Sequence, residues 1–110
     1  MRRRLIGAAL LALIVTAAGG CGASPPVHDH AVTITGAGYI PSVLHINAGD
    51  TVTWINEDAD RLHTVTARDD SFGSWFLGDG QRYTVRFNRP GTYRYFCDIH
   101  PSMVGEVDVT

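Results

Sequence analysis

Short segments in which hydrophobic and polar residues alternate follow one another along the second part of the chain. Residues 81–87 show this alternation most clearly, whereas residues 68–80 are irregular, and there Trp75 and Phe76 are expected to pack against the core. Strands are expected at residues 31–35, 43–46, 51–56, 63–67, 81–87, 92–97 and 105–109. No segment has a sustained helical period. The regular spacing of short strands predicts an all-β domain, either a sandwich or a barrel.

The first twenty residues have the composition of a signal peptide. Three arginines at 2–4 precede an apolar run at 5–18, which is shorter than the ~20 residues that a membrane-spanning helix needs. Small residues then lead directly to Cys21. The stretch resembles a bacterial lipoprotein signal, which implies that Cys21 carries lipid and becomes the first mature residue. Ala18 stands where such signals usually have leucine, and a plain secretory signal is the alternative.

The length of 110 residues allows one folded domain. We expect a signal peptide at residues 1–20, a flexible tether at 21–30 with its small, proline-containing composition, and the domain at 31–110. The mature protein is expected to be exported, to the periplasm or the cell surface. It would be anchored to the membrane if Cys21 carries two or more acyl chains.

Charge excludes one class of partner. The chain contains no lysine, and beyond residues 2–4 its six arginines face eleven acidic residues, so this remainder has a formal charge of −5. Binding to a phosphate backbone depends on clustered cations. We therefore do not expect nucleic acid as a partner.

The richest chemistry lies near the C-terminus, where Cys97, His100 and Met103 follow one another at spacings of three. These residues fall between two expected strands, and His63 begins another strand 34 residues before Cys97. Two imidazoles, a thiolate and a weakly bound thioether form the ligand set of blue-copper electron-transfer sites. If Cys21 is lipidated, no disulfide can form, and a metal is the other common means of stabilising a small domain.

Strand parity supports the same group independently. Cys97 shares a face with Tyr93 and Tyr95, because side chains alternate along a strand. The aromatic residues mark the inward face. The sulfur of Cys97 is therefore expected to lie at the end of the core.

The same residues carry a resemblance to the cupredoxin, or blue copper, family over residues 31–110, closest to the amicyanin and plastocyanin branch. The matching elements are the run 91–105, Asn47-Ala48-Gly49-Asp50, Tyr39-Ile40-Pro41 and His63-Thr64-Val65. The resemblance implies a Greek-key β-sandwich that carries single electrons between redox partner proteins and is not an enzyme. It also implies one copper ion, with His63, Cys97 and His100 as equatorial ligands and Met103 as the axial ligand.

The resemblance has one informative exception at Ile99, where many relatives have proline. Unlike proline, Ile99 has a backbone N–H, which could donate a hydrogen bond to the sulfur of Cys97. Such a bond would stabilise the reduced metal.

Several alternatives stay open at this point. Zinc also binds tetrahedral sets of nitrogen and sulfur, although methionine is not among its usual ligands. A Cys–His nucleophilic pair is conceivable, but the sequence supplies no orienting third group. The main functional alternative is a copper-binding module for storage or delivery, and a metal-free structural sandwich is another. For the copper protein we expect a monomer.

Overall fold

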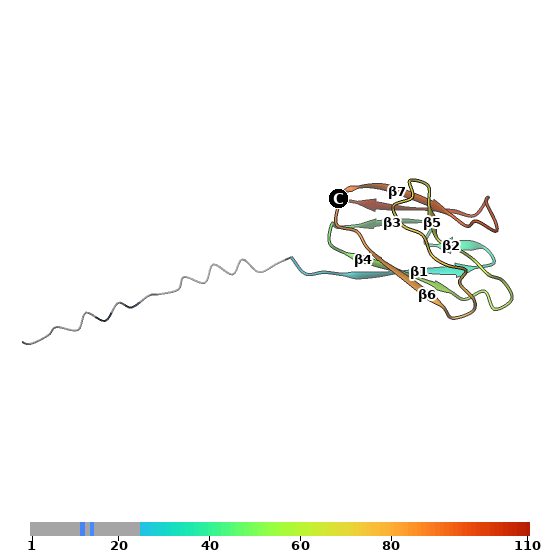
Figure 1. Ribbon diagram of the computed structural model, residues 1–110, viewed down its shortest axis with the longest axis horizontal. Helices are drawn as coiled ribbons and strands as arrows, with labels where there is room; N and C mark the ends of the chain where they lie inside the picture. Colours follow the sequence, from blue (N-terminus) through green and yellow to red (C-terminus); the bar gives the residue numbers. More distant parts are fainter. Residues whose placement is uncertain (1–11, 13, 15–24) are drawn as a thin grey trace, which may run out of the picture.

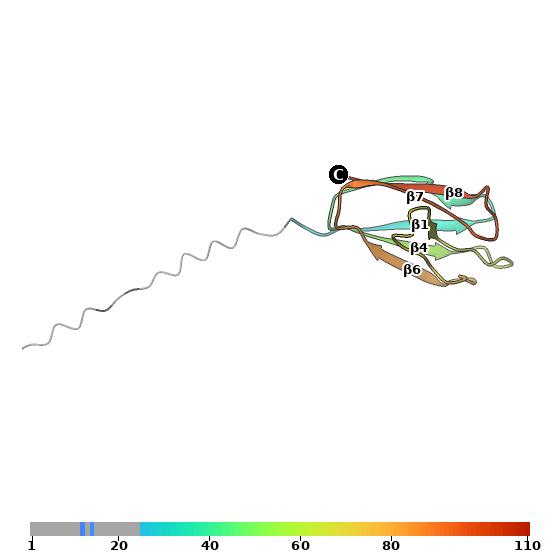
Figure 2. The same ribbon diagram turned by 45° about the horizontal axis from the view of Figure 1, so that its top comes forward.

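The structure is a computed structural model that describes residues 12, 14 and 25–110, and its described strands form two layers (Figures 1 and 2). The strands are β1 (Asp29–Thr35), β2 (Gly38–Ile40), β3 (Val43–Ile46), β4 (Thr51–Asn56), β5 (Thr66–Ala67), β6 (Arg82–Arg86), β7 (Gly91–Phe96) and β8 (Val104–Val109). Among the described residues, no helix is long and apolar enough to span a membrane. The all-β expectation is confirmed.

Each layer is a four-stranded sheet whose strands are not consecutive in the chain. One sheet has the order β2-β1-β4-β6 and the other the order β3-β8-β7-β5. The β1–β4 and β3–β8 pairs are parallel, and the remaining pairs are antiparallel. Because most connections cross from one sheet to the other, the layers form the Greek-key sandwich rather than a barrel.

Alternating side chains of both sheets fill the space between the layers. In β4, Val52 and Trp54 are fully buried, and in β7 Tyr95 is fully buried while Arg94 is exposed. The ring centroids of Trp54 and Tyr95 lie 5.3 Å apart in an edge-to-face arrangement. The fully buried Cys97 continues the inward face of β7, as strand parity predicts.

The prediction that Trp75 and Phe76 pack against the core is wrong. Their exposed fractions are 89% and 61%, and Phe72 and Leu77 fill the core instead. Isolated bridges join His63 to Leu77 and Thr66 to Gly73, so residues 74–76 oppose only residues 64 and 65. Three residues thus oppose two, which makes this segment a β-bulge. The bulge turns the side chains of Trp75 and Phe76 outward before Leu77 returns to the core.

The strand expected at 63–67 is also shorter than the sequence pattern indicates. Only Thr66–Ala67 forms a strand, and His63 is held by the single bridge to Leu77. By contrast, β2 is a strand that the sequence analysis did not single out. It extends the first sheet by pairing with the end of β1.

Strand β1 begins at Asp29, so it includes the last two residues of the expected tether. The buried carboxylate of Asp50 holds this start: it accepts hydrogen bonds from the amide of His28 at 3.1 Å and pairs with the His30 ring at 3.0 Å. The hydrogen bond with His30 is the main reason that the pKa of Asp50 falls to about 2. Cys21 and the expected signal peptide lie outside the residues that the structure describes, apart from residues 12 and 14.

The described N-terminal segment and the C-terminus lie at the same end of the sandwich (Figure 1). A surface cavity at this end is lined by both Pro25 and Thr110. The β7–β8 hairpin pairs Gly91 with Val109 here and Phe96 with Val104 at the opposite end. The loop between Phe96 and Val104, which contains the candidate ligands, is therefore at the end far from both described termini.

Candidate metal centre

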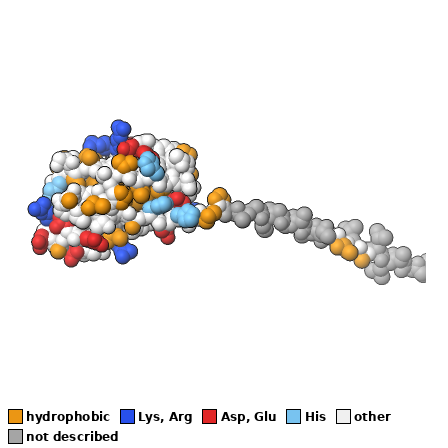
Figure 3. Space-filling view, turned by 180° about the vertical axis from the view of Figure 1, so that it is seen from behind, with side chains coloured by type: hydrophobic (Ala, Val, Ile, Leu, Met, Phe, Trp, Pro, Cys, Tyr) orange, Lys and Arg blue, Asp and Glu red, His pale blue; other side chains and the backbone are white. Residues whose placement is uncertain are grey.

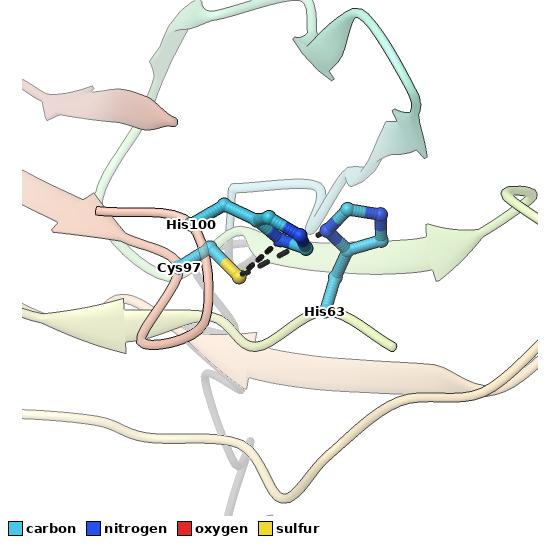
Figure 4. A group of neighbouring side chains, drawn as sticks. All are labelled: His63, Cys97 and His100. Carbon is cyan, nitrogen blue, oxygen red and sulfur yellow. Dashed lines mark hydrogen bonds between the residues drawn. The ribbon is translucent and has the colours of Figure 1, made fainter. Parts of the chain in front are cut away.

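Three of the expected ligands converge where the loop after β7 approaches the segment before β5 (Figure 4). The Nδ1 atom of His63 lies 3.9 Å from the Sγ atom of Cys97, and the Nδ1 atom of His100 lies 3.6 Å from it. The candidate ligand atoms of the three residues all lie within 4.8 Å of one another. His63 and Cys97 are buried, whereas His100 is half-buried. Within the described residues, this is the one such group of three histidine, cysteine or acidic side chains.

These spacings fit a single metal ion. Bond lengths of about 2.0 Å to imidazole nitrogen and about 2.3 Å to thiolate sulfur, at angles near 120°, separate nitrogen from sulfur by about 3.7 Å. The two observed separations, 3.6 and 3.9 Å, lie on either side of this value. Two imidazoles with one thiolate are a donor set that suits copper in both of its common oxidation states. The side chains therefore already have the arrangement that a small N₂S metal centre requires.

The ligand loop is held by its own backbone. The amide of Cys97 donates to the carbonyl oxygen of Met103 at 3.1 Å, and the amide of Met103 donates to the carbonyl oxygen of His100 at 2.8 Å. These two bonds close the loop directly beyond the last pair of the β7–β8 ladder. The spacing of three residues therefore places Cys97, His100 and Met103 in one short loop that is closed by hydrogen bonds.

The structure places Met103 beside the other expected ligands. Its side chain is half-buried against the core, and one surface cavity is lined by His63, His100 and Met103 together. The Cγ atom of Met103 also lies close to Gly38 of β2, because it is 3.9 Å from the position that a Cβ on this glycine would occupy. The side chain therefore lies at one wall of the site.

The sulfur of Cys97 accepts a hydrogen bond from the backbone amide of Thr64 at 3.3 Å. The carbonyl oxygen of Thr64 in turn accepts a hydrogen bond from the hydroxyl of Tyr39. Burial is the main cause of the raised pKa of Tyr39, so this hydroxyl remains a donor. Within the described residues the amide that donates to this sulfur is that of Thr64, and not that of Ile99, which the sequence offered as a donor. The donor of this bond comes from the segment before β5, 33 residues away from Cys97 in the sequence.

A carboxylate orients the buried histidine. The Nε2 atom of His63 lies 2.9 Å from Oδ2 of Asp58, which leaves Nδ1 facing the sulfur. The hydrogen bond from His63 is the main reason that the pKa of Asp58 lies below its usual range. Asn56 supports this loop, because its side-chain oxygen accepts a hydrogen bond from the amide of Asp58 at 2.9 Å. A second-layer carboxylate of this kind fixes the tautomer of a metal-binding imidazole and makes it a stronger donor.

The roles of Asp58 and Thr64 were not identified from the sequence. Asp58 lies in an acidic loop with Glu57 and Asp60, and such a run usually indicates no more than a solvated loop. Acidic side chains do gather at the end of the molecule away from residues 25–28 (Figure 3). The one signal that could have distinguished Asp58 is its position five residues before a candidate ligand.

Replacing Asp58 by asparagine is expected to weaken Cu(II) binding about tenfold, because the imidazole of His63 loses its charged partner. A competition titration against a chromophoric chelator measures this change. Asp60→Asn is the matched control, since Asp60 is exposed in the same loop and has no hydrogen bond to a ligand. An equal loss of affinity in both variants would show that only the overall charge of the loop matters.

Comparison with known proteins places the chain in a family. The profile of the cupredoxin-like domain matches residues 5–109. Amicyanin-alpha of Methylorubrum extorquens is 36% identical over 119 residues, covering 99% of each chain. The chloroplastic plastocyanin of Tetradesmus obliquus is 34% identical over 82 residues, or 63% of this chain and 56% of that protein.

A solved structure gives the same result. The purple cupredoxin of Nitrosopumilus maritimus superposes with a TM-score of 0.71 at 32% identity, covering 74% of this chain and all of that one. The resemblance found over residues 31–110 is thus confirmed, and the family match covers residues 5–109. The protein therefore belongs to the cupredoxin-like family, in the branch of amicyanin and plastocyanin.

Proposed function

We propose that this protein is a blue copper electron carrier that passes single electrons between redox partner proteins. The observation that carries this proposal is the convergence of His63, Cys97 and His100 at one end of the sandwich, with ligand atoms within 4.8 Å of one another. Two imidazoles and one thiolate are the equatorial ligand set of blue copper sites. The proposal therefore follows from the chemistry of the group as well as from the family.

The proposed ligands of the single copper ion are His63, Cys97 and His100 in the equatorial positions and Met103 in the axial position. The cavity that Met103 shares with both histidines supports its assignment. Methionine is a soft ligand that copper accepts and zinc rarely takes. The presence of Met103 therefore favours copper over zinc.

Bound copper would supply the one-electron Cu(II)/Cu(I) couple. The protein's part is to keep the ligands still while the charge changes: Asp58 holds the ring of His63, and the amide of Thr64 donates to the sulfur of Cys97. The N–H groups of Cys97 and Met103 close the ligand loop. Ligands held in this way need little rearrangement on gaining or losing an electron, which is the property that an electron carrier requires.

The half-buried ring of His100 is the proposed point of electron entry and exit. Exposed apolar side chains stand on the two segments that supply His63 and His100 and on the segment that pairs with the first of them. Leu62 precedes His63, Ile99 precedes His100, and the bulge that pairs with the His63 segment presents Trp75 and Phe76. We refer to Leu62, Trp75, Phe76 and Ile99 as the apolar rim. A rim of this kind lets a partner approach the metal end closely and exclude water.

Replacing Trp75 by alanine is expected to slow electron self-exchange between two copies of the protein about tenfold, since exposed tryptophans often dominate the energy of a contact. The visible spectrum should not change, because the 89% exposed side chain does not support the core. NMR line broadening in mixtures of the two oxidation states measures the rate. Val27→Ala is the matched control, being an exposed apolar residue at the opposite end. Equal rates in wild type and Trp75→Ala would exclude Trp75 from the contact.

The test of the proposed function is to add one equivalent of Cu(II) to the purified protein and record its visible and EPR spectra. We expect an intense thiolate-to-copper charge-transfer band and one copper per chain. Repeated reduction and reoxidation should leave the copper in place. Release of the metal during cycling would favour the alternative of storage or delivery, and the absence of the band would reject a blue copper site.

We also propose that the protein is exported and held at the membrane by lipid on Cys21, in the periplasm or at the cell surface. The support is the composition of residues 1–20 and the cysteine that follows directly. The partners would then be redox proteins of the same compartment, approached by a monomer.

A further inference from the structure

Three polar side-chain contacts form a closed ring beside the metal centre. The backbone amide of Asp98 donates to the hydroxyl oxygen of Thr64 at 2.8 Å. The hydroxyl of Thr66 donates to Oδ2 of Asp98 at 3.0 Å. The hydroxyl oxygens of Thr64 and Thr66 lie 3.0 Å apart. The ring thus contains two threonines and both the backbone and the side chain of one aspartate.

The chemistry of the groups fixes the direction of every bond in this ring. A hydroxyl has one proton, and Thr66 uses its own on the carboxylate of Asp98, which can only accept. Thr64 must therefore donate its hydroxyl proton to Thr66, while its oxygen accepts from the Asp98 amide. Every donor in the ring has an acceptor. One orientation of each hydroxyl satisfies the whole arrangement, so the ring can hold its members in a single geometry.

The ring lies where the strand ladder ends. Strands β5 and β7 form only two pairs, Thr66 with Phe96 and Ala67 with Tyr95. Beyond the pair of Thr66 with Phe96, both segments continue into the metal centre. There the ring replaces the missing ladder and joins the segment before β5 to the segment after β7.

Both segments are tied to Cys97, one through a hydrogen bond and the other through the chain itself. Thr64 supplies the amide that donates to Sγ at 3.3 Å, and Asp98 is the residue directly after Cys97. With its carbonyl oxygen bonded to Tyr39 and its hydroxyl in the ring, the buried Thr64 has all its polar groups engaged. The position of its amide relative to the sulfur is thus set from both sides.

We propose that Thr66 and Asp98 are positioning residues that hold the Thr64 amide on the sulfur of Cys97 and so raise the reduction potential of the copper. The inference rests on the proposed function and adds to it a device that adjusts the potential. A hydrogen bond to a thiolate withdraws charge from it and therefore favours the reduced metal. Neither residue is itself a ligand.

The first test is Thr66→Val in the copper-loaded, full-length protein. Valine keeps the β-branched shape that suits a strand but removes both hydrogen bonds of the Thr66 hydroxyl. We expect the reduction potential to fall by an amount equal to about a tenfold change in the ratio of Cu(I) to Cu(II) affinity, or about 59 mV for one electron. Thr66→Ser, which keeps the hydroxyl, should restore the potential. Protein-film voltammetry measures all three proteins.

The matched control is Thr53→Val. The hydroxyls of Thr53 and Thr84 form a threonine pair 2.8 Å apart on the other sheet, so this variant also loses a hydroxyl–hydroxyl hydrogen bond. Its potential should equal that of the wild type. A shift in Thr53→Val as large as that in Thr66→Val would overturn the proposal, because it would trace the effect to a general loosening of the sandwich.

A second pair of variants separates the ring from the charge of Asp98. Asp98→Asn and Asp98→Ala both remove the negative charge, but only asparagine keeps an oxygen that can accept from Thr66. We expect the potential of Asp98→Ala to lie below that of Asp98→Asn. Equal potentials in the two variants would mean that only the charge matters, and would overturn the positioning role.

The third readout needs no copper. In the metal-free protein, the amides of Thr64 and Asp98 should exchange with solvent faster in Thr66→Val than in wild type, and at the wild-type rate in Thr53→Val. Unchanged exchange would overturn the inference even if the potential moved. A wild-type protein without the charge-transfer band would instead contradict the proposed function, while the exchange rates would still report on the ring.

Discussion

Replacing Cys97 by serine is expected to abolish the visible charge-transfer band of the copper-loaded protein and to weaken Cu(II) binding by more than about 100-fold. Loss of an outer-layer partner alone costs metal sites 10- to 100-fold in affinity, and here a bonded soft sulfur is lost. The side chain is fully buried, and serine differs from cysteine by one atom, so the fold should survive. Absorption spectroscopy and a chelator competition measure the two effects.

The control for this variant is His45→Ala. The side chain of His45 is 76% exposed on β3, where it pairs with Asp108 at 3.3 Å rather than with the metal centre. The copper band of this variant should match that of wild type in position and intensity. A band that survived in Cys97→Ser and disappeared in His45→Ala would place the copper at another site.

Replacing Gly105 by alanine is expected to destabilise the metal-free protein by about 3 kcal/mol, the upper part of the usual range for overpacking a core. A Cβ on Gly105 would overlap the ring and hydroxyl of Tyr95, which lies directly opposite it in the β7–β8 pair. Tyr95 is fully buried and packs edge-to-face against Tyr39 at 4.7 Å, so it has little room to move. Chemical denaturation measures the free energy of unfolding.

The same substitution should also alter the copper spectrum. Displacement of Tyr95 would disturb Tyr39, whose hydroxyl bonds to the carbonyl oxygen of the residue that donates to the sulfur. Gly73→Ala is the control, because a Cβ there meets no atom within 4 Å, and its stability should lie within about 0.5 kcal/mol of wild type. Equal stabilities for the two alanine variants would contradict the predicted overlap.

The inward position of Cys97 could be predicted from the sequence because the alternation of side chains along a strand is a local property. Tyr95 and Cys97 are both fully buried, as the parity of β7 requires. The proximity of the candidate ligands Cys97, His100 and Met103 could be predicted for a similar reason, since the loop that contains them is closed by its own backbone.

Features that depend on pairing between distant segments could not be predicted in this way. The exposure of Trp75 follows from a bulge, and the bulge depends on which residues of the His63 segment pair with Gly73 and Leu77. The hydrogen bond from Thr64 to the sulfur joins residues 33 positions apart. The sequence pointed to the amide of Ile99 as a donor to the sulfur instead, because only residues close in the sequence could be judged to be close in space.

The shared position of the two described chain ends has a practical consequence. Pro25 and Thr110 line one cavity, and the loop with the ligands lies at the far end of the sandwich (Figure 1). An affinity tag, a fused enzyme or an electrode linker could therefore be attached beyond either of these residues without screening the copper. Molecules immobilised in this way would all expose the end with the Phe96–Val104 loop to the solution.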